Sequence, residues 1–202
     1  MKKTGFYVTL IKSAVFLLSI FTILLLISFD LKASDLSDAR TLRERCEKEI
    51  KTLEIAVLNF GTEKIKQDFQ EGEKKIKLAK VKYIQTRYTE AIELYNGYLK
   101  LQYAIYRDLA GIYIDRTAKI IDDIGVELVD FVDNKKIEKY FIMASQNLND
   151  AKKLNSSQHY RQVIDGCRQA KNYAISAYEV AGKKAPQQYA VDIQDNKNQI
   201  NR

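Results

Sequence analysis

Five acidic side chains lie close together in the sequence and have the chemistry to bind a metal ion. They are Asp122, Asp123, Glu127, Asp130 and Asp133. Asp123, Glu127 and Asp130 would share one helical face, because they are four and three residues apart. A zinc site would add histidine or cysteine ligands, and a calcium loop has a regular oxygen spacing that is absent here. The sequence therefore predicts no metal site, and the acidic set is interpreted as the solvated side of an exposed helix.

Catalytic chemistry has few candidates in this chain. The single histidine, His159, falls in a predicted turn and has no nearby cysteine or serine in a hydrolase motif. The sequence also lacks a Gly-rich phosphate loop, a zinc-protease helix motif and a nucleophile elbow. We therefore predict no catalytic residue, no cofactor and no enzymatic activity.

The two cysteines, Cys46 and Cys167, both fall on apolar stripes of predicted helices. In an oxidising compartment they could form a disulfide that ties the first predicted helix to the last. The alternative is two buried free thiols that pack as small apolar side chains. The sequence leaves both readings open.

The elements that position these residues are helices. One proline, no tryptophan and few glycines, with long runs of helix-forming residues, indicate an all-α fold. Apolar residues recur every three or four positions, which favours about five amphipathic helices in antiparallel hairpins. The expected ranges are 37–60, 65–83, 88–133, 137–154 and 160–181. The third is either one long central helix or two helices with a kink at Gly111 or Gly125, and it makes the molecule elongated.

The segment 72–111 contains the clearest hairpin. Leu78 and Ala79, then Tyr83, then the run from Tyr88 to Tyr95 with Ala91 inside it, resemble one tetratricopeptide-type helical hairpin. In that family, small residues at the positions of Ala79 and Ala91 let the two helices touch. The resemblance implies a helical scaffold that binds other proteins, and it implies no chemistry.

A second hairpin follows at a fixed distance along the chain. With an offset of 72 positions, Ala79, Lys80, Tyr88 and Ile92 fall on identical residues, which are Ala151, Lys152, Tyr160 and Ile164. Tyr95 falls on Cys167. These matches suggest an internal repeat of the hairpin.

Two features favour an interaction surface. Seven of the thirteen tyrosines lie between Tyr83 and Tyr113, and they cannot all face one stripe; the alternative is that they pack between helices of the same chain. The second feature is a basic block, 74–87, well separated from the acidic set, which could mediate salt-sensitive assembly or could be a solvated face. The candidate interface residues are Tyr98, Tyr103, Tyr106, Tyr113, Lys77, Lys80 and Lys82.

The N-terminus has the layout of an export signal. Lys2 and Lys3 precede an apolar run that ends shortly before Ala33, so residues 1–33 are predicted to be a signal peptide. An uncleaved signal anchor in the inner membrane is the alternative, because the run approaches the length of a bilayer span. The helical domain would then cover 34–182, and the polar segment 183–202 is predicted to be a disordered tail.

The charge balance gives little support for nucleic-acid binding. The whole chain has a formal charge of +7. Residues 1–33 contain four basic and one acidic side chain, so the remainder carries only +4. The expected partners are therefore proteins, or further copies of the chain, with the membrane reached only through an uncleaved N-terminal segment.

The sequence thus predicts an exported, periplasmic, non-enzymatic scaffold for protein–protein assembly in a bacterial envelope. In architecture and composition it is similar to the all-helical sheath proteins of spirochaete periplasmic flagella, of the flagellar-coiling type, and that resemblance implies a component of a filament sheath. The alternative is an inner-membrane-anchored adaptor or envelope stress protein.

Overall fold

The computed structural model describes residues 35–131 and 133–200, and the side chains among them up to residue 196. These residues contain six α-helices and no β-strand. The helices cover 35–60, α2 (Glu63–Ile84), α3 (Tyr88–Glu127), α4 (Lys135–Ser156), α5 (Tyr160–Val180) and α6 (Ala190–Ile200). The all-α fold with antiparallel packing and a long central helix is therefore confirmed.

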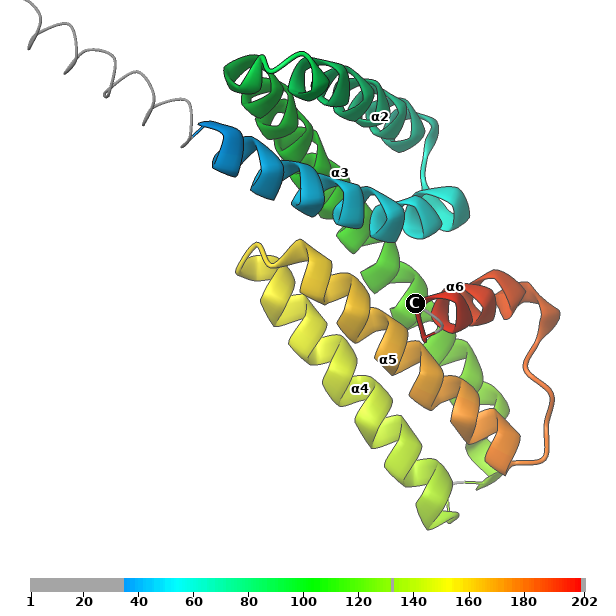
Figure 1. Cartoon of the computed structure of the whole chain (residues 1–202). Helices are drawn as coiled ribbons and strands as arrows, with labels where there is room; N and C mark the ends of the chain where they lie inside the picture. The colour runs from blue at the N-terminus through cyan, green and yellow to red at the C-terminus, as the bar shows by residue number, and fades with distance from the viewer. Residues whose placement is uncertain (1–34, 132, 201–202) are drawn as a thin grey trace, which may run out of the picture.

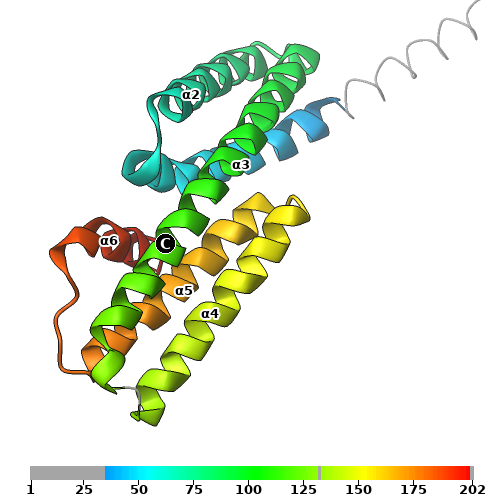
Figure 2. The ribbon, with the colours of Figure 1, turned by 180° about the vertical axis from the view of Figure 1, so that it is seen from behind.

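Helix α3 organises the molecule. Its 40 residues span about 60 Å at 1.5 Å per residue. Helix 35–60 and α2 pack beside its first half, while α4, α5 and α6 pack beside its second half (Figures 1 and 2). Gly111 and Gly125 lie inside this one helix, and a short 3-10 turn, Val129–Phe131, leads from it to α4.

The helix ends follow from local capping. Gly61 closes the first helix with a backbone hydrogen bond of 2.8 Å to the Val57 carbonyl, and the Thr62 side chain accepts a bond of 3.3 Å from the Ile65 amide at the start of α2. The α2–α3 turn passes through Thr86 with φ of 59°. The breaks between the first three expected helices, after residue 60 and after residue 83, are thus confirmed.

The two hairpins are structural repeats in register. Shifting α2 by 72 positions reproduces the bounds of α4, and both helices have 22 residues. The same shift takes the left-handed residue Thr86 to Gln158, whose φ is 62°, and maps the three backbone hydrogen bonds of one turn onto those of the other. Ala79 and Ala91 fall on Ala151 and Val163, and all four side chains are completely buried. The internal repeat suggested by four identities therefore extends through the whole hairpin.

Tyr95 and Tyr98 form a dense centre between helix 35–60, α2 and α3. Both are completely buried and lie in one cluster with Cys46, Ile76 and Ala79. Neither tyrosine hydroxyl has a hydrogen-bond partner among the described residues. Each therefore carries an uncompensated cost of desolvation.

Replacing Tyr98 by phenylalanine is expected to raise the free energy of unfolding by about 1 kcal/mol, because the change removes a buried hydroxyl and keeps the ring. Urea unfolding followed by circular dichroism measures the shift. The matched control is Tyr113→Phe, which removes a hydroxyl bonded to Asp195 at 2.8 Å and should lower stability. If Tyr98→Phe destabilises the protein as much as the control, the Tyr98 hydroxyl has a stabilising partner.

Of the two arrangements that the sequence left open for the cysteines, the disulfide is not formed. Cys46 and Cys167 are both free and buried, and they belong to different clusters of buried residues. The Cys46 thiol points at the Tyr95 carbonyl, 3.9 Å away. Burial raises the pKa of Cys46 to about 12 and that of Cys167 to about 11, so both thiols stay protonated and unreactive. The alternative of two packed free thiols is the arrangement observed.

The polar C-terminal segment differs from the predicted disordered tail. After α5 the chain turns at Gly182, whose φ is 71°, runs through Pro186 and forms the 3-10 turn Gln187–Tyr189 followed by α6. Tyr189, Asp192 and Asp195 are buried. The prediction failed because the buried face of α6 is polar and leaves no apolar periodicity to read.

Candidate functional site

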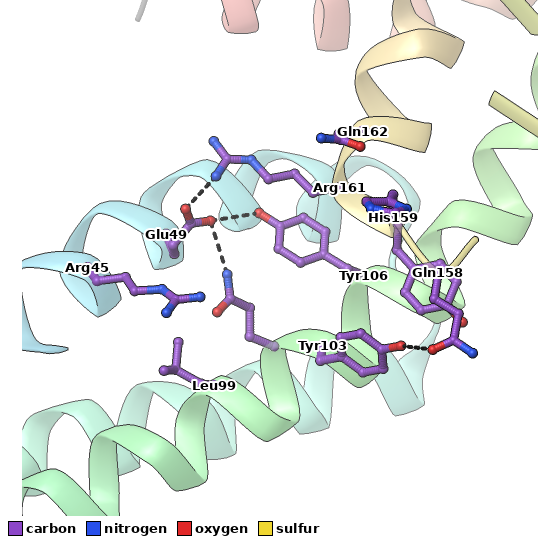
Figure 3. A pocket seen from close by; sticks show the side chains of 11 residues that line it. Arg45, Glu49, Leu99, Tyr103, Tyr106, Gln158, His159, Arg161 and Gln162 are labelled. Atoms are coloured by element: carbon purple, nitrogen blue, oxygen red, sulfur yellow. Dashed lines mark hydrogen bonds and ion pairs between the residues drawn. The ribbon is translucent and has the colours of Figure 1, made fainter. Parts of the chain in front are cut away.

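A groove lies where the two halves of the molecule meet. It has a volume of about 320 Å³ and is lined by helix 35–60, the middle of α3 and the beginning of α5. Figure 3 shows the side chains converging from these three helices. Residues Leu99, Gln102, Tyr103 and Tyr106 are three, one and three positions apart, so they share one face of α3.

Glu49 is the centre of the groove. Its carboxylate accepts hydrogen bonds from Gln102 Nε2 at 3.0 Å and from the Tyr106 hydroxyl at 3.3 Å, and it forms an ion pair with Arg161. These three partners come from two other helices (Figure 3). Burial, and then the negative charge of Glu49, raises the pKa of Tyr106, which keeps its hydroxyl protonated as a donor. Glu49 therefore fixes the floor of the groove in one geometry.

The rim of the groove is aromatic. The Tyr103 hydroxyl donates to Gln158 Oε1 at 2.8 Å, and its ring meets Tyr160 edge to face with centroids 5.2 Å apart. Tyr103 nevertheless stays 48% exposed. Burial and the hydrogen bond to Tyr160 raise the pKa of Tyr103. A large, rigid and half-exposed tyrosine is well suited to contact another protein.

Positive charge remains available around the groove. Arg45 lines it and is exposed, with no ion-pair partner in the described part of the chain. A second, shallower hollow continues past Leu99 and Tyr103 to Lys100, which is also exposed. Because Arg161 neutralises Glu49, the two free cations give the groove a net positive charge.

His159 also lines the groove, at the N-cap of α5. Its side chain is exposed, and α5 has no side-chain cap bond at this residue. The sequence placed His159 in a turn, and the structure adds that this turn closes one end of the groove. It lies beside Gln158, Tyr160 and Arg161 rather than beside a nucleophile.

The predicted interface tyrosines divide into two groups. Tyr103 lies on the groove and is exposed, as expected of an interface residue. Tyr98 and Tyr113 are completely buried, and Tyr106 is 7% exposed with only its hydroxyl reaching the groove floor. Their assignment to an exposed interface is wrong, because α3 is covered by other helices on more than one side.

The predicted interface lysines are partly engaged within the chain. Lys80 pairs with Glu47 of helix 35–60 at 3.0 Å, and Lys82 pairs with Glu90 at 2.9 Å. Lys77 is exposed on the outer side of α2. The basic block thus contributes to packing of the first three helices as well as to the surface.

Two residues of the acidic set are engaged within the chain. Asp123 pairs with Lys119 at 2.8 Å and accepts a hydrogen bond from the Tyr189 hydroxyl, while Glu127 accepts one from Tyr178. Asp130 lies beyond the end of α3 in the 3-10 turn. Among the residues that the structure describes, no three His, Cys, Asp or Glu side chains are grouped to hold a metal ion.

A buried ion cluster lies at a second place, beneath α6. Asp195 accepts two hydrogen bonds from Arg168, at 2.8 and 3.0 Å, and bonds of 2.8 Å from Tyr113 and 3.0 Å from Asn59. Asp192 pairs with Lys171 at 2.9 Å, and on its other side with Arg116 at 2.6 Å. Sequence reasoning missed this cluster, since its members span residues 59 to 195 and share no pattern.

Within the described ranges, no helix is both long and apolar enough to cross a membrane. The predicted signal peptide or anchor, residues 1–33, lies outside those ranges. Comparison of the chain with family models, with curated proteins and with solved structures gives no match in any of the three.

Proposed function

We propose that this protein is an exported, non-enzymatic helical scaffold that assembles with other proteins of a bacterial envelope through the groove around Glu49. The observation that carries the proposal is the groove itself, in which three helices place an exposed tyrosine and free cations around a fixed floor. Such a surface provides aromatic contact area and electrostatic selection without any arrangement for bond-breaking chemistry.

The groove favours an acidic partner segment. Arg45 and Lys100 are exposed and carry no ion pair among the described residues, so a carboxylate of a partner would gain their charge without breaking an existing pair. Tyr103 lines both the groove and the hollow that continues it, so it can pack on an apolar or aromatic side chain of the same segment.

Site-specific crosslinking in cells tests this proposal. A photoreactive amino acid at Tyr103 is expected to capture defined envelope proteins, which mass spectrometry identifies. The same group at Leu58, which is 72% exposed and outside the groove, is the control. Capture at Tyr103 should fall about tenfold when Arg45 and Lys100 are changed to glutamate, as for loss of electrostatic complementarity worth more than 1 kcal/mol. Equal capture from both positions, or capture indifferent to the charge reversal, would contradict the groove as the binding site.

Export is supported by the basic and apolar N-terminal layout and is tested separately. The N-terminus of the protein isolated from its native cells should be Ser34 or a residue within a few positions of it. Recovery of Met1 in a membrane fraction would instead favour the inner-membrane-anchored adaptor. The finer proposal of a flagellar sheath component is supported by the resemblance in architecture, and it requires filament subunits among the captured proteins.

A further inference from the structure

The buried face of α6 is polar. Asp192 and Asp195 are completely buried and Asn196 is 3% exposed, whereas Val191 is 45% exposed. Among the side chains described in the segment 187–196, apolar contact is limited to Tyr189, in the preceding turn, and the partly buried Ile193. A helix that packs mainly through the hydrophobic effect shows the opposite distribution. Helix α6 is therefore held against the rest of the chain mostly by hydrogen bonds and ion pairs.

The surface beneath α6 is a cationic recess. Arg116 from α3 and Arg168 and Lys171 from α5 face the two carboxylates. The rings of Phe60 and Tyr113 form its walls, with Lys171 Nζ 5.0 and 4.8 Å from their centroids. Arg168 also has Asp165 at 3.7 Å, so without α6 three cationic side chains would face one carboxylate, and the empty recess would attract an acidic helix.

The segment that joins α5 to α6 contains a stretch, 183–186, without regular secondary structure. It leaves α5 through Gly182 at φ of 71° and Pro186. In the first repeat, the positions equivalent to 181–189 are 109–117, and they lie inside the straight helix α3. The second repeat therefore departs from the first at Gly182 and Pro186, and this connection is where the backbone would change course if α6 left its own recess.

We propose that α6 is exchanged between copies of this chain, so that the cationic recess of one copy binds the α6 helix of a second copy. The recess requires a helix with carboxylates three positions apart and a tyrosine three positions before the first, and α6 supplies all of these with Tyr189, Asp192 and Asp195. An exchanged helix makes the same contacts as a folded-back one. The local concentration of copies then decides between the folded-back and the exchanged form. This inference does not depend on the groove or its partner.

Two complementary variants of the protein, each isolated from its native cells, test the exchange. The first, Asp192→Asn with Asp195→Asn, keeps an intact recess and has a weakened α6. The second, Arg168→Gln with Lys171→Gln, keeps an intact α6 and has a weakened recess. Analytical ultracentrifugation is carried out on each variant alone and on their mixture, up to about 1 mM, the effective concentration that a short tether provides. Each variant alone should remain a single chain, and the mixture should approach a twofold mass.

A third variant, Asp150→Asn, is the matched control. Asp150 is exposed on α4 and pairs only with Lys153, so this copy keeps its own α6 over its recess. Its mixture with the second variant should stay at the mass of one chain. If circular dichroism shows that the double variants lose helix, the single variants Asp195→Asn and Arg168→Gln replace them in the same experiment. A complementary mixture that never exceeds one chain, or equal association with the Asp150 control, would overturn the proposal.

Discussion

Changing Asp195 to alanine is expected to detach α6 while α3, α4 and α5 remain folded. The carboxylate accepts four hydrogen bonds, from Arg168, Tyr113 and Asn59. If α6 stayed in place, Arg168 would be a buried charge without its partner, at a cost of about 3 to 5 kcal/mol. Detachment of α6 lets water reach Arg168 and limits that cost, so the local transition is the favoured response.

Native-state amide hydrogen exchange measures this outcome. Protection of residues 187–196 should fall to that of an open segment, while the amides of α4 should change little. The control Asp150→Ala removes an exposed carboxylate from an ion pair and should shift the free energy of unfolding by less than about 0.5 kcal/mol. If protection of α4 and α5 falls together with that of α6, then α6 belongs to the cooperative core and is not a separate unit.

Acid is expected to release α6 by the same route. Burial tends to raise the pKa of Asp195, but the hydrogen bonds and charge of Arg168 outweigh it and hold the pKa below its ordinary value. The stabilisation from a carboxylate with a lowered pKa is complete above its unfolded pKa of about 4 and is lost as the pH falls further. Amide chemical shifts of α6 should therefore be constant from neutral pH to about 4 and change below it. Although burial opposes it, Asp195 raises the pKa of Arg168, which remains charged throughout this range. A transition centred near neutral pH would show that a different group controls α6.

The hairpins could be predicted from the sequence because their determinants are local. A cap such as Thr62, a turn residue such as Thr86 and an apolar residue at every third or fourth position act within a few residues of one another. The repeat could be detected for the same reason, since each copy preserves these local signals. Most helix ends were displaced by one or two residues, as at α2, which was expected from residue 65 and begins at Glu63. The largest displacement is at α3, which was expected to reach residue 133 and ends at Glu127.

The buried tyrosines could not be assigned from periodicity alone. Tyr95 and Tyr98 are three residues apart and therefore lie on the same face of α3, but periodicity does not say whether such a face packs within the chain or meets a partner. Both are completely buried, because helix 35–60 and α2 cover two sides of the first half of α3. How many helices surround a central helix depends on tertiary packing, and a single amphipathic pattern does not record it.

The groove and the ion cluster could not be predicted from the sequence. Glu49, Gln102 and Arg161 are separated by more than 50 residues from one to the next. Each is of a residue type that is usually found on the solvated surface. Only the fold brings them together. Asp192 and Asp195 were predicted to belong to a polar tail for the same reason. The sequence does not distinguish an aspartate that is buried in an ion pair from one that is exposed to solvent.

Leu109→Ala is expected to have a large effect on global stability. Leu109 is completely buried in the middle of α3 and belongs to a cluster that joins Leu53 and Ile65 of the first helices to Val163 and Ile164 of α5. Removing its side chain loses apolar burial and leaves a cavity, which costs about 2 to 5 kcal/mol for a buried leucine. The matched control is Leu58→Ala on helix 35–60, where the side chain is 72% exposed and the expected change is below about 0.5 kcal/mol.

The form of the unfolding transition tests how α3 connects the two halves. Because one cluster runs through the middle of this helix, both halves should lose stability together, and a single transition should move to lower urea concentration with an unchanged slope. Hydrogen exchange then assigns the loss to particular helices, with α2 and α5 expected to lose protection by the same amount. If α2 keeps its protection while α5 loses it, the halves on either side of Leu109 unfold independently, and α3 connects two separate cooperative units.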